Sequence, residues 1–434
     1  MNDIDELQKN YLKIIDNIKI DELTQFSLKK ILFNETFYVQ KMTRKKSIYN
    51  FIISSFIFPV KINFNNNNNN IILISNRWNR KDHDSYWNKI KKCFNNYSEI
   101  SILSYENIYD ILKNFHLIKG MVHFIKKIRL LKQLKEFKEF KTRLYFTSKV
   151  YQIIQYKEML EMSRIEGKVA ICFFDSEFFS NIVMQYFKNK GAFTITNQHG
   201  QPLFRSFKED LLNQSQIINF SCDYFMAKGE FTKKQFISAG FAPDKIVVIG
   251  SFNKDDKKTS YRSNKTNTFA LFLDCPTYDF AYTINQRLLD MAYGICKELN
   301  YKCVIKLHPV DNISNYKIET CSNIRLENKN VKIKDICNKI EFGILHASAV
   351  YLDLMENNTK AYKYESEINF PIVDCENDKF TNIQMLKKNF YEWKQASDLQ
   401  KQGYFESLRR NYSCSVNTEQ KYIEFVEQLL KGEK

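Results

Sequence analysis

The sequence predicts an α/β protein with two domains, each built around a parallel β-sheet. At 434 residues the chain is too long for one compact core, so its length favours at least two domains. Short apolar runs alternate with segments of helical periodicity between residues 169 and 250 and again between 269 and 355, which is typical of strand–helix–strand units. The intervening stretch 254–268 is polar, charged and nearly free of apolar residues, so we interpret it as a linker.

Composition and charge narrow the class of protein without fixing its ligand. A hydrophobic fraction of 44% is typical of a folded globular chain. The 65 Lys and Arg residues outnumber the 49 Asp and Glu residues, and the resulting net charge of +16 attracts phosphorylated ligands, nucleic acid or anionic lipid. The 10 cysteines are scattered singly, without Cys/His spacing for zinc, so we expect reduced thiols and no disulfide framework.

Targeting and membrane-spanning signals are not evident in the sequence. Residues 1–6 are acidic, whereas a signal peptide begins with a basic and then an apolar region. The longest apolar runs, such as 51–60, are interrupted or shorter than a bilayer span. We therefore expect a cytoplasmic protein that meets a membrane only as a peripheral protein on the inner face of the plasma membrane.

The first elements are an N-terminal helical extension followed by strands. Residues 1–48 are polar, with apolar side chains at helical spacing. Residues 51–64 are apolar and β-branched and predict strands, and the asparagine run 65–70 predicts a loop. Buried strands are predicted at 71–75 and 100–104.

The lysine-rich segment 111–145 predicts an amphipathic helix or helix pair. Its apolar residues recur every three or four positions and leave most of the rest to lysine and arginine. The predicted apolar stripe comprises Ile118, Val122, Ile125, Ile128, Leu131, Leu134, Phe137 and Phe140. Two alternatives follow: the stripe packs on the protein's own sheet, or the segment docks onto anionic lipid through its apolar and basic residues together.

Two strand ends in the first half carry polar residues suited to catalysis or binding. Strand 169–174 ends at Asp175 and Glu177, and strand 191–196 ends at the sequence Asn197-Gln198-His199-Gly200. Parallel sheets bind ligands beyond the carboxyl ends of their strands, so these side chains are candidate site residues. Helices at 178–188 and 232–239 and strands at 224–229 and 245–250 complete this half.

Three strand ends in the second half lie in one predicted region. Strands at 269–273, 303–307 and 342–345 alternate with helices at 284–299 and 350–355. The residues at their ends are Asp274, Thr277, Tyr278, Lys306, His308, Pro309, His346 and Ser348. A lysine and a histidine at a strand end can point at a phosphate, and the Ser348 hydroxyl with the first amides of helix 350–355 offers a second anion site.

Each candidate also has a plain structural alternative. His308 before proline can simply close its strand, and His346 can pair with backbone carbonyls. Ser348 can be a helix cap, and Glu177 a solvated carboxylate at a helix start. Asp274, Thr277 and Tyr278 can fill turns as well as contact a ligand.

The motifs at these strand ends resemble those of bacterial surface-polysaccharide transferases with two Rossmann-like domains, the GT-B architecture. The resemblance covers residues 169–356 and rests on the ordered set Gln198-His199-Gly200-Gln201-Pro202, Pro276-Thr277-Tyr278, His308-Pro309 and Ser348-Ala349-Val350-Tyr351. The set is similar to the CDP-glycerol glycerophosphotransferases of teichoic-acid synthesis, to capsule glycosyltransferases, and to bacterial sialyl- and Kdo-transferases. Gln198, Gln201 and Ala347 depart from the glycerophosphotransferase pattern, so sugar transfer is favoured over transfer of glycerol phosphate.

The resemblance implies a domain plan and a mechanism. It implies an N-terminal helical extension (1–48), an acceptor domain (49–258), a nucleotide-donor domain (259–405) and a C-terminal helical segment (406–434) that crosses back onto the first domain, with the two domains facing across a cleft. The donor would be a nucleotide sugar held by Thr277, Tyr278, Lys306, His308, Pro309, His346 and Ser348. His199, Glu177 or Asp175 would act as the base, and Gln198 and Gly200 would contact the acceptor.

The implied reaction needs no metal or other cofactor, since no Asp-x-Asp metal motif lies at these strand ends. The implied acceptor is a glycan or a lipid-linked glycan of capsule, lipooligosaccharide or O-antigen. Three alternatives stay open: a glycerophosphotransferase, a sugar-nucleotide epimerase of the same architecture, and a nonenzymatic protein that binds lipid or another polyanion. Nucleic acid is not an expected partner. The sequence has no RNA- or DNA-binding signature with interleaved aromatic residues, and its basic residues concentrate on one helical stretch.

Overall fold

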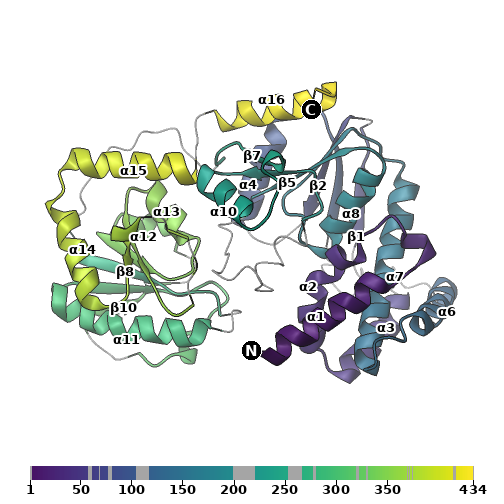
Figure 1. Cartoon of the computed structure of the whole chain (residues 1–434), viewed down its shortest axis with the longest axis horizontal. Helices are drawn as coiled ribbons and strands as arrows, with labels where there is room; N and C mark the ends of the chain where they lie inside the picture. The colour runs from purple at the N-terminus through teal and green to yellow at the C-terminus, as the bar shows by residue number, and fades with distance from the viewer. Residues whose placement is uncertain are drawn as a thin grey trace.

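The computed structural model of the chain contains two sheets, each enclosed by helices (Figure 1). It describes residues 2–56, 61–67, 69–76, 81–103, 117–198, 220–252, 266–276, 280–318, 322–328, 331–368, 370, 372–373, 375–413 and 417–433. The predicted site residues His199, Gly200, Thr277 and Tyr278 lie outside these described residues.

Three helices precede the first strand: α1 (Asn2–Asn17), α2 (Leu28–Gln40) and α3 (Arg44–Phe56). The predicted helical start of the chain is therefore confirmed, but the prediction of strand for residues 51–64 is wrong over 51–56. Phe51, Ser54 and Ser55 are buried at helical spacing, so the apolar run serves one face of α3.

The N-terminal sheet has seven strands in the order β1-β3-β2-β4-β5-β6-β7. Only β1 is antiparallel to its neighbour. The strands are β1 (Lys61–Asn65), β2 (Ile71–Asn76), β3 (Ser98–Leu103), β4 (Val169–Cys172), β5 (Phe193–Asn197), β6 (Tyr224–Ala227) and β7 (Ile246–Val248). The chain passes from β2 outward to β3 and then returns to β4 on the other side of β2, so the topological switch point lies between β2 and β4.

Helices cover both faces of the N-terminal sheet. They are α4 (Lys81–Lys92), α6 (Leu117–Gln133), α7 (Phe140–Ser163), α8 (Phe178–Asn189) and α10 (Glu230–Ser238). Alternate residues of β2 enter different cores, since Ile72 and Ile74 pack with α7 and α8 whereas Leu73 packs with α4. Residues on both faces are buried, which explains why the central strands are continuous apolar runs.

The segment predicted as a basic amphipathic helix forms the pair α6 and α7, but its apolar stripe does not pack as one surface. Leu134 and Phe137 are buried, whereas Ile118, Val122 and Ile125 on α6 are exposed. Lys127, assigned by periodicity to the polar face, is fully buried. Packing on the protein's own sheet therefore accounts for only the later part of the stripe.

The C-terminal sheet has six parallel strands in the order β10-β9-β8-β11-β12-β13. The strands are β8 (Thr268–Phe272), β9 (Lys302–Lys306), β10 (Ile324–Leu326), β11 (Phe342–Leu345), β12 (Lys360–Tyr364) and β13 (Lys379–Phe380). In chain order this is the 3-2-1-4-5-6 arrangement of the Rossmann fold, with its switch point between β8 and β11. The helices are α11 (Ala281–Leu299), α12 (Ile333–Cys337), α13 (Val350–Glu356), α14 (Ile383–Gln395) and α15 (Asp398–Tyr412).

The last helix, α16 (Thr418–Lys431), packs on the N-terminal sheet, as Figure 1 shows. Its buried residues Tyr422, Phe425 and Val426 share a core with Leu73 and Ile171 of that sheet. The predicted class, an α/β protein with two Rossmann-like parallel sheets in a GT-B-like arrangement, is confirmed. Among the described residues, none of the helices combines the length and apolar character needed to cross a bilayer.

Candidate functional site

The strongest candidate site lies where β8 and β11 end, at the switch point of the C-terminal sheet. The two strands are hydrogen-bonded neighbours, with Phe269 opposite Phe342 and Leu271 opposite Ile344. Their chains then leave the sheet in opposite directions, because β8 leads to β9 and β11 leads to β12. Open parallel sheets bind ligands in the crevice that such a divergence creates, so the residues just beyond these strands define the site.

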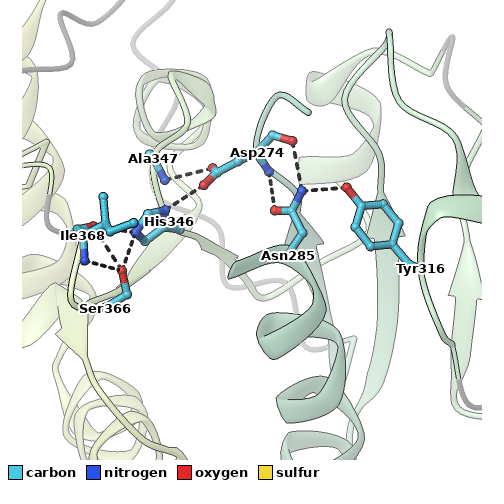
Figure 2. A network of polar contacts seen from close by, with 7 residues as sticks. All are labelled: Asp274, Asn285, Tyr316, His346, Ala347, Ser366 and Ile368. Atoms are coloured by element: carbon cyan, nitrogen blue, oxygen red, sulfur yellow. Dashed lines mark hydrogen bonds and ion pairs between the residues drawn. The ribbon is translucent and has the colours of Figure 1, made fainter. Parts of the chain in front are cut away.

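A buried aspartate and histidine join the two strand ends (Figure 2). The Nδ1 atom of His346 lies 2.6 Å from Oδ2 of Asp274, and the backbone N–H of Ala347 donates to Oδ1 of Asp274 over 2.9 Å. On the other side of the ring, Nε2 of His346 lies 3.0 Å from Oγ of Ser366 and 3.0 Å from the carbonyl oxygen of Ile368. The ring is fully buried, so the loops after β11 and β12 are fastened to the end of β8.

The same network continues to the loop after β9. The Asn285 side chain accepts from the backbone N–H of Asp274 over 2.8 Å, and its amide group donates to the Asp274 carbonyl over 3.1 Å and to the Tyr316 hydroxyl over 2.9 Å. The Tyr316 hydroxyl in turn donates to Oδ2 of Asp311 over 2.6 Å. The backbone N–H of Asp311 donates to the His308 carbonyl over 2.9 Å, which ties the predicted His308 motif to the network.

This network fixes the geometry of four strand ends. Asp274, Asn285, Asp311 and His346 are buried, whereas Tyr316 and Ser366 are half-buried. Hydrogen bonds join them, and such networks are rigid because breaking a contact leaves a buried polar group without a partner. Burial, together with the hydrogen bond to Asp311, raises the pKa of Tyr316, so its hydroxyl stays a donor across the physiological pH range. The loops after β8, β9, β11 and β12 are therefore held in one arrangement before any ligand binds.

Lys306 and His308 border this network at the end of β9. Lys306 is the last residue of the strand and is 6% exposed, with its Nζ atom 3.4 Å from the Asn328 carbonyl. His308 is half-buried, and its Nδ1 atom accepts from the backbone N–H of Val310 over 3.4 Å. Its Nε2 atom has no hydrogen-bond partner among the residues that the structure describes. Pro309 is exposed.

Two of the predicted donor-site residues have structural roles in this arrangement. His346 has both ring nitrogens in internal contacts and no exposed surface, which fits the alternative that it pairs with backbone carbonyls. The Ser348 hydroxyl accepts from the backbone N–H of Val350 over 3.3 Å, while Ala349 occupies the cap position of α13. α13 spans only 7 residues, so its dipole is small.

In the N-terminal sheet, Asp175 and Glu177 follow β4 at the switch point between β2 and β4. The Oδ2 atom of Asp175 accepts from the backbone N–H of Ser221 over 2.8 Å and of Cys222 over 3.2 Å. Burial raises the pKa of Asp175, and these hydrogen bonds oppose the shift. Asp175 is thus an anchor for the chain that precedes β6, whereas Glu177 is half-buried at the start of α8 and is the more accessible carboxylate.

Gln198 is the last described residue before the predicted His199 motif. It is 1% exposed, and its side-chain oxygen accepts from the backbone N–H of Lys228 over 2.6 Å. Its own backbone N–H donates to the Met226 carbonyl over 3.0 Å. Gln198 therefore joins the ends of β5 and β6.

The sequence did not predict Asn285, Tyr316, Asp311, Ser366 or Ile368 as members of the site. They come from a helix interior and from loops, where polar residues are common and carry no strand-end signal. Within the described ranges, no three His, Cys, Asp or Glu residues are grouped so as to hold a metal ion.

Comparisons with known proteins give only distant likenesses. No family model matches the chain, and no curated protein matches it. Among solved structures, the chain is similar to Staphylococcus aureus MnaA with UDP (10% identity, 83% of this chain, 96% of that chain, TM-score 0.49) and to a UDP-GlcNAc 2-epimerase from Neisseria meningitidis bound to UDP-GlcNAc (10%, 83%, 99%, 0.48). It is also similar to a glycosyltransferase from Rickettsia africae, with 15% identity over 84% of this chain and 99% of that chain and a TM-score of 0.46. With TM-scores below 0.5, these likenesses carry no argument for a shared activity or ligand.

Proposed function

We propose that the chain is a glycosyltransferase that moves a sugar from a nucleotide-activated donor to a cell-surface glycan or its lipid-linked precursor. The observation that carries the proposal is the network at the switch point of the Rossmann-ordered sheet, which joins Asp274, His346 and the His308 loop. A rigid arrangement of this kind suits a ligand whose phosphates must be held in one position while a bond to them breaks.

The donor phosphates would lie beside Lys306 and His308. A lysine ammonium and an imidazole N–H both donate hydrogen bonds to phosphate oxygens and stabilise the negative charge that develops on a departing nucleotide. Burial of Lys306 strengthens this interaction, because water screens it less. The chemistry supplied by these two side chains needs no metal ion.

The acceptor would be activated from the N-terminal sheet. Glu177 is the candidate base that the described residues favour, since Asp175 is enclosed by hydrogen bonds. His199 is the other candidate and rests on its sequence motif. We expect Glu177→Gln to lower turnover strongly while leaving donor affinity unchanged if Glu177 removes the acceptor proton.

An epimerase and a glycerophosphotransferase would bind their nucleotide at the same strand ends of the C-terminal sheet but would catalyse different reactions. An epimerase converts the sugar nucleotide without an acceptor, and a glycerophosphotransferase accepts CDP-glycerol in place of a sugar nucleotide. No observation on the described residues favours either over sugar transfer. We propose that the reaction takes place on the cytoplasmic side of the membrane and that no nucleic acid takes part as a partner.

A panel of donors tests the proposal. The purified chain is incubated with UDP-, GDP-, CDP- and CMP-sugars and with CDP-glycerol, and thermal stabilisation, nucleotide release and sugar composition are measured. Stabilisation by one sugar nucleotide, with nucleotide release that increases when glycan acceptors are added, would support transfer. If the sugar is converted without an acceptor, the chain is an epimerase and not a transferase. If none of the donors stabilises the chain, the proposal is refuted.

A further inference from the structure

Helix α6 exposes a row of large apolar side chains that nothing in the described structure covers. The α6 stripe comprises Leu117, Ile118, Met121, Val122, Ile125 and Ile128, which are between 39% and 82% exposed. Residues at these intervals lie on one side of a helix. Figure 1 shows α6 at the outer edge of the molecule, beyond α7 as seen from the N-terminal sheet.

The opposite side of α6 is firmly packed, so the exposure of the stripe is a fixed property of the fold. The Nζ atom of Lys127 donates to the Phe51 carbonyl over 3.0 Å and to Oγ of Ser54 over 2.6 Å. Phe124 packs edge-on against Phe51, with ring centroids 5.8 Å apart. Gly120 allows the close approach of the Phe56 ring, because a Cβ atom at this position would lie 2.2 Å from it.

Positive charge surrounds the stripe. On α6 itself Lys119, Lys126, Arg129 and Lys132 are exposed. The neighbouring helix α3 exposes Arg44, Lys45 and Lys46 at its start, and neither helix contains an aspartate or glutamate. The acidic side chain that contacts this group is Glu158 of α7, whose Oε1 atom lies 3.9 Å from Nζ of Lys126.

We propose that the α6 stripe docks onto an anionic lipid bilayer, with α6 lying in the plane of the headgroups. A helix with an apolar outer face and flanking lysines gains from burying the apolar side chains among acyl chains and from attraction to anionic headgroups. A second copy of this chain is disfavoured as the occupant, because two such faces would bring like charges together. The proposal goes beyond the proposed function and does not depend on it.

Vesicle binding by the full-length chain tests this proposal. Vesicles of phosphatidylcholine with about 30 mol% phosphatidylglycerol are compared with pure phosphatidylcholine vesicles in a flotation assay. We expect binding to the anionic vesicles only, and a decrease of about tenfold or more when salt is raised from about 50 to about 500 mM. The double substitution Ile118→Ser/Ile125→Ser should lower the fraction bound at least about tenfold, and Lys119→Gln/Arg129→Gln should weaken binding at low salt and reduce the salt dependence.

Two highly exposed apolar residues outside the stripe provide the control. Met162 and Leu399 are 81% and 80% exposed, so Met162→Ser/Leu399→Ser removes comparable apolar surface without touching the stripe and should leave binding unchanged. Circular dichroism and thermal unfolding confirm that each variant is folded. Absence of vesicle binding, or equal binding by the stripe and control variants, would overturn the proposal. Light scattering provides the last check. If the native chain is a dimer and the stripe variant is a monomer, the stripe is a dimer interface, and the proposal is overturned.

Discussion

At the scale of single residues, the candidate site depends on polar side chains that have no contact with solvent. Asp274 and His346 are buried and bonded to each other, and each also holds backbone groups of a loop. The sequence identified both positions because they follow apolar strands. It did not identify Asn285 and Tyr316, because their role arises only when α11 and the loop after β9 come together in the fold.

Asp274 provides the first prediction. Asp274→Ala leaves the Ala347 N–H and the His346 ring without their acceptor inside the core, so we expect a loss of about 2–5 kcal/mol in the free energy of unfolding. Urea denaturation measures this loss. The control is Asp290→Ala on exposed α11 surface, which should change the stability by less than about 0.5 kcal/mol. Equal stability of the two variants would show that the network does not hold the strand ends.

At the scale of elements, the central strands and the edge strand β7 were predictable, whereas β10, β12 and β13 of the C-terminal sheet were not. β4, β8, β9 and β11 are apolar runs buried on both faces, which sequence patterns reveal directly. β12 was missed because it contains two lysines, and both are buried through ion pairs: Lys360 with Asp378, and Lys363 with Glu365 over 3.1 Å. The apolar pattern of the strand is interrupted by these lysines, and it does not show that ion pairs allow them to be buried.

Two further predictions of secondary structure were wrong, one in α3 and one at the boundary between α14 and α15. The apolar residues 51–56 are as suited to a strand as to a helix, and only packing of α3 against α6 and α7 decides between them. The periodicity of residues 383–399 predicts a single helix, but α14 ends at Gln395, because Ser397 begins a new helix with a capping box in which its hydroxyl accepts from the Gln400 N–H over 3.3 Å.

The anchoring of α6 leads to a prediction about pH. Burial lowers the pKa of Lys127 from 10.5 to about 7, while its two hydrogen bonds favour the charged form. The folded chain therefore binds fewer protons than the unfolded chain between about pH 7 and pH 10.5, so this residue makes the free energy of unfolding rise with pH in that range. Lys127→Met should reduce that rise and increase stability near pH 7 by roughly 1–4 kcal/mol.

Urea denaturation of the native chain and of Lys127→Met at pH 7 and pH 9 measures the effect. Lys132→Met, on the exposed side of the same helix, is the matched control and should retain the native pH dependence. If Lys127→Met and the native chain show the same difference in stability between the two pH values, the pKa of Lys127 is not lowered in the folded chain.

At the scale of the whole molecule, the chain crosses between its two sheets more than once. Beyond the covalent linker, α16 packs on the N-terminal sheet, and the ring of Phe231 in α10 contacts the ring of Tyr412 in α15, tilted by 34° with centroids 4.4 Å apart. Burial lowers the pKa of Lys228, and Glu356 and Asp353 of α13 oppose the shift. The return of α16 was predictable from its apolar face. The contact between α10 and α15 was not predictable, because neither helix has its apolar residues gathered on one distinct face.

Gly229 provides the prediction at this scale. A Cβ atom at Gly229 would lie 2.4 Å from the carbonyl oxygen of Asn411 and 2.4 Å from the backbone of Tyr412, so Gly229→Ala forces α10 and α15 apart. We expect a loss of about 1–3 kcal/mol in urea denaturation. Gly403→Ala on α15 meets no atom within 4 Å and should be neutral or stabilise the chain by up to about 1 kcal/mol. A neutral Gly229→Ala would mean that this contact is not formed in solution.

The central claim is that the carboxyl ends of β8, β9 and β11 bind the phosphates of an activated sugar donor, and calorimetric titration with the nucleotide that most stabilises the chain tests it most directly. β9 carries a lysine at each end, Lys306 beside the network and Lys302 exposed at the opposite end, so Lys306→Met and Lys302→Met form a matched pair. The account predicts that Lys306→Met weakens nucleotide binding about tenfold or more, as one charge-assisted hydrogen bond is lost, while Lys302→Met binds as the native chain does. Equal affinities of the two variants would contradict it.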